Sequence, residues 1–157
     1  MTFQDFINKL KEMSTGNKST FLGELEGIHD NWHSNRNFEG FPVGFLSFHR
    51  EIIFYYRRVL RKQGQKLPRA YTLAQLSVLH PYERWIDELD NERIFSQAIE
   101  NWHNSVHRNH HDPDFMDPKK NIYLNDFWKL HLFLNNRFTR WLRINNVTYQ
   151  SVNHRNV

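Results

Sequence analysis

The chain has 157 residues, of which 39% are hydrophobic and 15% aromatic, and its formal net charge is +4. This length suits one core built largely from bulky rings, so we expect a single domain over residues 1–157. Cysteine is absent, which excludes disulfides and thiolate metal sites and leaves histidine and carboxylates as ligands for any metal.

The basic residues are dispersed among acidic ones, in segments such as "YYRRVLRK" and "NNRFTRWLR". This distribution is typical of a solvated surface and argues against nucleic-acid binding. The first segment, "MTFQDFINKLKEM", mixes charged and apolar residues, unlike a signal peptide, and no stretch has the length of a membrane span. We therefore expect no nucleic-acid partner, no membrane and a cytoplasmic location.

Helical periodicity dominates the first half of the chain. Apolar residues recur on one side of residues 3–14 and again over 20–34, where Ser19 or Thr20 would cap the helix and Glu24 would lie in its first turns. The chain turns in "NRNFEGFPVG". The run "FLSFHREIIFYYRRVLRKQ" then predicts a long third helix that ends at Gly64.

The second half of the chain continues the helical pattern and contains no convincing strand. Pro81 interrupts the segment that leads to Leu89, which predicts short, broken helix. Residues 91–109 and 123–144 predict two long helices, and the polar stretch "HHDPDFMDPKKN" predicts a loop between them. The expected fold is all-α, with a four-helix bundle core that carries a dinuclear metal site and with additional short helices.

Two pairs of histidines have a spacing of four residues. His29 and His33 lie in "GIHDNWHSN", and His103 and His107 lie in "IENWHNSVHRNHH". Four residues are about one helical turn, so each pair can direct both imidazoles at one point.

A fifth and a sixth histidine lie on the apolar stripes of the helices that follow these pairs, His49 on the third helix and His131 on the last. A lone histidine in such a place is more often a hydrogen-bonded core residue than a metal ligand. Six buried imidazoles without partners would be destabilising, however, and two metal ions would satisfy them together. The predicted ligands are His29, His33, His49, His103, His107 and His131.

The other four histidines follow no such pattern. His80 precedes a proline, His110 and His111 lie in the polar loop, and His154 lies in the C-terminal tail. We expect them at the surface or in support of the ligands, with His110 or His111 as candidates for the mouth of a site.

Three segments between Leu25 and Trp141 place a histidine among aromatic residues: "GFLSFHREIIFYYRRVL", "WHNSVH" and "DFWKLHLFLNNRFTRW". In this order they resemble the copper motifs of the tyrosinase, catechol oxidase and hemocyanin superfamily. "GFLSFHREIIFYYRRVL" looks like the first copper motif, in which "FLPWHR" leads into a long helix. "WHNSVH" is similar to the second motif, "HNxVH", and "DFWKLHLFLNNRFTRW" resembles the closing "DPxFWLHHxxxDRxW". The resemblance implies a type 3 site with two copper ions, each held by three histidines.

Such a site activates dioxygen to oxidise a small aromatic substrate, here an o-diphenol or o-aminophenol, with monophenol hydroxylation as an optional earlier step. Compared with the family motifs residue by residue, His49 matches the helical histidine of the first motif, and His103 and His107 match the paired histidines of the second. His131 matches the latter histidine of the closing pair. Asn104 falls beside a ligand of the second copper, where the family handles the phenolic proton, and we expect Glu100 to assist it.

The chain departs from the family pattern in several places. The family's middle ligand of the first copper lies about nine residues before the first-motif histidine, where this chain has Gly40. His29 looks like the first helical ligand, and His33 must then replace the missing one, a usage closer to hemocyanins. Arg57 stands where glutamate is usual, and the closing "DP" and "DR" are altered. These departures bear on the reaction type more than on metal binding.

Other functions remain open on the sequence alone. Glu26 and Glu100 precede His29 and His103 by three residues, as in ferritin-like di-iron bundles. Such a site would take further carboxylates from Glu51 or Asp126, whereas imidazole-rich ligation favours copper and does not exclude zinc. A dioxygen carrier, a copper-binding protein without turnover and a plain helical interaction module are the alternatives outside enzymes.

Overall fold

The computed structural model describes residues 2–36 and 44–149. This part of the chain contains α-helices and short 3-10 helices but no strand, so the all-α class is confirmed. The elements in chain order are α1 (Phe3–Met13), α2 (Lys18–Asn35), α3 (Gly44–Lys62), α4 (Leu73–Leu79), η1 (Arg84–Glu88), α5 (Glu92–Asn109), η2 (Pro113–Met116), η3 (Asn121–Tyr123) and α6 (Asn125–Ile144). Gly40, most of the predicted turn around it, and His154 lie outside the described residues.

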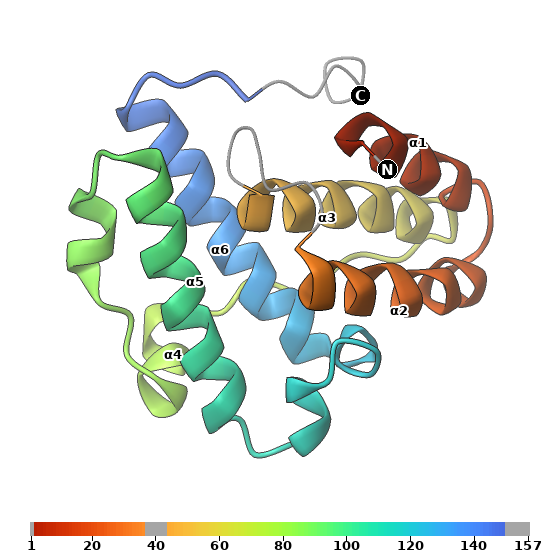
Figure 1. Cartoon of the computed structure of the whole chain (residues 1–157). Helices are drawn as coiled ribbons and strands as arrows, with labels where there is room; N and C mark the ends of the chain where they lie inside the picture. Colours follow the sequence, from red (N-terminus) through yellow and green to blue (C-terminus); the bar gives the residue numbers. More distant parts are fainter. Residues whose placement is uncertain (1, 37–43, 150–157) are drawn as a thin grey trace.

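The four long helices are arranged as two pairs (Figure 1). Helix α3 runs beside α2, and α6 packs most extensively against α3. Helix α6 also meets α5 through large side chains, where the rings of Phe95 and Trp141 stack with centroids 5.2 Å apart. Helix α1 covers α3 through Phe6, which stacks on Phe48 at 4.7 Å. A regular four-helix bundle core is not confirmed, because the two pairs cross.

Capping side chains explain where the helices begin. Helix α2 starts earlier than predicted, at Lys18, because Asn17 rather than Ser19 or Thr20 is its N-cap. The Asn17 side chain accepts from the Thr20 backbone N–H and the Thr20 hydroxyl accepts from the Asn17 backbone N–H, a reciprocal capping box. Glu24 therefore lies beyond the first turn, which contains no acidic residue.

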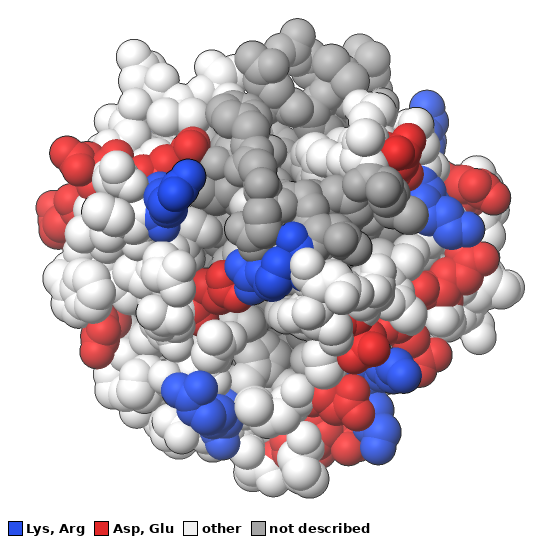
Figure 2. Space-filling view, viewed as in Figure 1, with Lys and Arg blue, Asp and Glu red and all other residues white. Residues whose placement is uncertain are grey.

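The core is rich in rings, as the composition predicts. The largest fully buried side chains include Trp32, Tyr55, Phe6, Phe21, Phe45, Phe48, Phe95, Phe115, Phe127 and Phe138. Such rings fill space with few rotatable bonds, so they fix the helices that carry the histidines. Among the described helices, none is both long and apolar enough to cross a membrane. Figure 2 shows acidic and basic side chains interspersed over the face in view.

Candidate metal centre

The two helix pairs bring the six predicted histidines together in two groups of three. One group consists of His29, His33 and His49 from α2 and α3, and the other of His103, His107 and His131 from α5 and α6. Within each group one nitrogen of every ring lies within 4.8 Å of the others, and five of the six residues are buried; His33 is half-buried. Each group therefore has the composition and spacing of a three-imidazole metal site. We call them the first and the second triad.

In the first triad the Nε2 atoms converge. His29 Nε2 lies 3.3 Å from His49 Nε2 and 3.0 Å from His33 Nε2. The Nδ1–H groups of His29 and His49 donate to the backbone carbonyls of Pro118 and Phe45, at 2.7 and 2.8 Å. These two bonds fix the tautomer, so the Nε2 atoms of His29 and His49 face each other with lone pairs and no proton between them.

Two facing lone pairs repel each other unless a cation lies between them. Nitrogens bound to one tetrahedral metal at about 2.0–2.1 Å are about 3.3 Å apart, which matches the observed separations. Fixing Nδ1–H on a carbonyl and leaving Nε2 for the metal is also the usual way in which proteins orient histidine ligands. The first triad therefore fits a metal ion.

The second triad contains buried nitrogens without partners. Among the described residues, neither nitrogen of His131 nor Nε2 of His103 has a hydrogen-bond partner. The other nitrogen of His103 donates weakly to the Glu100 carbonyl at 3.3 Å, and His107 Nδ1–H donates to the Phe115 carbonyl at 2.6 Å. Unpartnered buried polar atoms are rare because they are destabilising. A metal ion bound by His103, His107 and His131 would give these buried nitrogens a partner.

The two triads adjoin each other across α3 and α6. The rings of His49 and His131 stack with centroids 4.3 Å apart and an angle of 15° between their planes, and His49 and His103 lie 6.4 Å apart. Phe127 contacts both His131, at 4.3 Å, and His29, at 5.3 Å. Two ions held by these triads would be neighbours in one apolar, ring-lined space.

Burial keeps all six imidazoles neutral. It lowers the pKa of His29 and His107 to about 4, and a backbone hydrogen bond partly offsets the effect in each. Burial, with the nearby His29 and Arg36, lowers the pKa of His33 to about 3. The pKa values of the remaining three lie well below 6.5 for the same main reason; they are His49, His103 and His131. Neutral imidazole is the form that binds metals.

No carboxylate joins either triad in the described part of the chain. Arg36 binds the Glu100 carboxylate in a bidentate ion pair, with the second contact at 2.9 Å. Burial and the nearby Glu26 carboxylate raise the pKa of Tyr123, so Glu26 lies beside that hydroxyl rather than beside a triad. The backbone carbonyl of Glu100, rather than its side chain, contacts His103. Main-chain carbonyls, rather than these two glutamate side chains, orient the imidazoles.

The two further carboxylates of the iron hypothesis are also engaged elsewhere. Glu51 is fully buried and accepts from the Tyr149 hydroxyl, and Asp126 accepts from His110 at 2.7 Å. The donor set around the triads is therefore imidazole alone. This composition suits copper or zinc better than a carboxylate-bridged iron pair.

A cavity of about 270 Å³ opens onto the triads. Its lining contains one histidine of the first triad and two of the second, together with Asn104; the lining residues are His33, His103, Asn104, His107, Arg108, Met116, Pro118 and Asn121. A cavity of about 150 Å³ is enough to hold benzene. A small aromatic molecule, and not only dioxygen, therefore has room beside the metal ligands.

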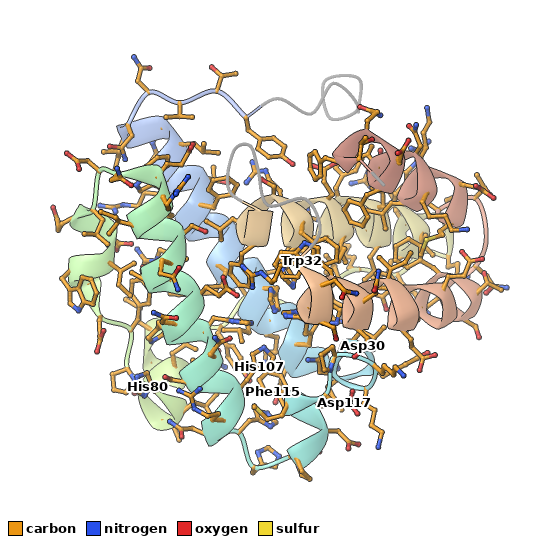
Figure 3. All side chains as sticks on the ribbon, in the orientation of Figure 1. Asp30, Trp32, His80, His107, Phe115 and Asp117 are labelled. Carbon is orange, nitrogen blue, oxygen red and sulfur yellow. The ribbon has the colours of Figure 1, made fainter. Side chains whose placement is uncertain are left out.

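The loop between α5 and α6 contributes more than the sequence indicated. Its carbonyls at Phe115 and Pro118 orient one ligand of each triad, and Figure 3 shows Phe115 next to His107. Nothing in the sequence marks a backbone carbonyl as a partner of a residue 89 positions away, as for His29 and Pro118. Only the two prolines of "HHDPDFMDPKKN" hint that this loop has a fixed shape.

The other described histidines lie outside the triads. His80 is half-buried at the end of α4, and His111 is exposed. The His110 side chain, by contrast, is only 3% exposed, so of the two expected positions, at the surface or in support of the ligands, the surface is excluded for it.

Comparison with known proteins returned no match to this chain among family models, curated proteins or solved structures.

Proposed function

We propose that this protein is a type 3 dicopper oxidase that uses dioxygen to oxidise a small phenolic substrate, an o-diphenol or o-aminophenol. The observation that carries the proposal is the pair of adjoining, buried three-histidine triads, each complete within one helix pair. The order of the three copper-motif resemblances along the chain supports the same class. Two copper ions, when bound, would supply the paired one-electron redox centres that dioxygen chemistry requires.

The residues of the chain would divide the remaining tasks. The ring-lined space around His49 and His131 excludes water from the ligands, while the cavity beside His103 admits the substrate ring. Asn104 lines that cavity, where its amide would hold the water that takes the phenolic proton. Glu100, bound by Arg36, would keep the backbone behind His103 in place.

A dioxygen carrier or a copper-binding protein without turnover is the second candidate. A carrier has to admit dioxygen alone, whereas the cavity volume of about 270 Å³ exceeds the space that one aromatic ring needs. This observation favours the oxidase.

The decisive experiment loads the protein anaerobically with cuprous copper and then admits air. We expect two coppers per chain, strong near-ultraviolet absorption, no paramagnetic signal because the two cupric ions couple, and consumption of a catechol or an aminophenol. His49→Ala and His107→Ala should each lose copper, and His80→Ala is the matched control. Unchanged copper content in both ligand variants would refute the site. A coupled copper pair that leaves both substrates untouched would establish the carrier.

A further inference from the structure

A second buried histidine network lies next to the second triad. His110, in the loop after α5, has a side chain that is only 3% exposed although its neighbour His111 is exposed. Its Nδ1 accepts from the Asp112 backbone N–H at 3.1 Å, so Nε2 carries the proton and donates to Asp126 Oδ2 at 2.7 Å. Both nitrogens are thus used in protein contacts, and His110 is not a metal ligand.

Asp126 anchors this network to the rest of the fold. It lies in the first turn of α6, the helix that carries His131, and burial together with the nearby Asp126 carboxylate raises the pKa of Tyr71. Tyr71 is held in turn by its backbone N–H, which donates to the Lys129 carbonyl at 3.1 Å. The carboxylate of Asp126 therefore ties the loop that contains His110 to the start of α6.

The network reaches His107 through Phe115 in η2. The His110 ring stacks on the Phe115 ring with centroids 4.1 Å apart, and the Phe115 ring also lies 4.3 Å from the His107 ring. The Phe115 carbonyl accepts the His107 Nδ1–H at 2.6 Å and the Asn121 amide at 3.2 Å. Phe115 thus contacts His107 with both its ring and its carbonyl, and His110 holds Phe115 in place.

We propose that His110 and Asp126 are positioning residues that fix the tautomer and the orientation of His107 through the η2 turn. The consequence for metal binding rests on the proposed function; the effect on His107 itself does not. Holding Nδ1–H on the Phe115 carbonyl leaves Nε2 as the ligand atom, directed at the second triad. Without the His110–Asp126 pair, η2 would lose its direct side-chain link to α6 and the Phe115 carbonyl would be held only through Asn121, so its position would be less fixed.

The test begins with the metal-free protein and nuclear magnetic resonance of the histidine side-chain nitrogens. In the wild-type protein His29, His49 and His107 should each show a single Nδ1–H tautomer. His110→Phe keeps the ring stack but removes both hydrogen bonds, and Asp126→Leu removes the acceptor. Both variants should give mixed tautomers for His107 and leave His29 and His49 unchanged, because other carbonyls hold those two rings.

Two matched variants separate this role from general damage. Asp126→Asn keeps an oxygen that accepts from His110 and should restore the wild-type His107 signal. His111→Phe changes the exposed neighbouring imidazole and should have no effect. If His110→Phe fails to fold, the His107 tautomers of Asp126→Leu and Asp126→Asn are compared instead, and a difference between them supports the positioning role. A single, unchanged His107 tautomer in folded His110→Phe and Asp126→Leu overturns the proposal.

Zinc titration of the same variants measures the consequence for the metal. Loss of a residue that orients a ligand weakens metal binding by about 10–100-fold. In His110→Phe and Asp126→Leu we expect this loss of affinity for the ion at the second triad, and no change in affinity for the ion at the first triad. Equal affinities in wild type and variants would overturn the metal consequence. A wild-type protein that binds neither zinc nor copper would refute the proposed function, and the His107 signals would still decide the positioning role.

Discussion

The imidazole of His131 shows how the demands of a metal site oppose those of a stable core. It is 1% exposed and, among the described residues, neither ring nitrogen has a hydrogen-bond partner. Such a group lowers the stability of the protein until a metal or another partner binds it. At His29, by contrast, the Pro118 carbonyl already satisfies one nitrogen.

The first prediction concerns His131→Leu. Leucine fills a similar volume and leaves no buried polar atom unpaired, so the metal-free variant should be more stable than the wild type by about 1–3 kcal/mol. It should also lose the second metal ion. Urea unfolding of the metal-free proteins and metal analysis measure the two effects. His29→Leu is the control, because it leaves the Pro118 carbonyl without its donor and should be destabilising. A less stable His131→Leu would contradict this account.

The second prediction is a pH dependence of the metal-free protein. The six triad imidazoles have folded-state pKa values well below 6.5, because burial disfavours their charged form. Below about pH 6.5 the unfolded chain therefore binds more protons than the folded one, and stability falls as the pH falls towards 4. More than about one unit above pH 6.5 both states are neutral at these positions, so this contribution to stability is complete.

Unfolding free energies at several pH values between 4.5 and 8 measure this dependence. Replacement of His131 by leucine should reduce the slope by about one proton, because one imidazole is removed. A slope that does not change between wild type and His131→Leu would contradict the assignment of His131 as a buried neutral group.

At the scale of the helices, Arg36 and Glu100 link the two triads. Arg36 is the C-cap residue of α2, in the left-handed conformation with φ of 52°, and its guanidinium lies over the Trp32 ring at 4.4 Å. The ion pair with Glu100 joins the end of α2, which carries His33, to α5, which carries His103. This ion pair therefore connects the helix pair that carries the first triad to the pair that carries the second.

The third prediction is that Glu100→Gln spares both metal ions. The Arg36 side chain is 37% exposed, so solvent weakens the ion pair and its loss should change stability by no more than about 1 kcal/mol. Glu26→Gln and the double variant should likewise retain two coppers. Metal analysis and near-ultraviolet spectra measure this. Loss of metal in the double variant would instead indicate carboxylate ligands and the di-iron alternative.

Helix positions and inward-facing histidines could be predicted from the sequence because both depend on local periodicity. The positions of α3, α5 and α6 agree with the expected ranges to within about two residues, and the placement of His49 and His131 followed from their apolar stripes. Contacts between distant segments could not be predicted. The sequence left His110 either at the surface or in support of the ligands, because its burial depends on Asp126 and Phe115, which only the folded loop brings to it.

At the scale of the whole molecule, the packing of the aromatic core does not depend on metal binding at the triads. The stacks of Phe6 on Phe48 and Phe95 on Trp141 hold the helices together without any ligand nitrogen. The metal-free protein should therefore fold, and metal should add stability by binding the folded state alone.

The fourth prediction follows from this separation. Each ion should raise the free energy of unfolding by about 2.7 kcal/mol when its concentration is about 100 times its dissociation constant. In thermal melts at graded concentrations of zinc or cuprous copper, the melting temperature should rise about twice as steeply with the logarithm of the metal concentration for the wild type as for His131→Leu. Circular dichroism of the metal-free protein should retain its helical signal. A melting temperature that does not depend on the metal concentration would contradict metal binding by the two triads.

The division of the ligands between the helix pairs bears on how the centre is assembled. The first triad is complete within residues 29–49 and the second within residues 103–131, and neither needs a ligand from the other pair. During synthesis the first half emerges from the ribosome with all of its imidazoles long before the second half exists. Under the proposed function, each triad can therefore bind its ion without a ligand from the other pair, and we expect a protein with a single ion as an intermediate, with His29 fully oriented only once Pro118 is in place.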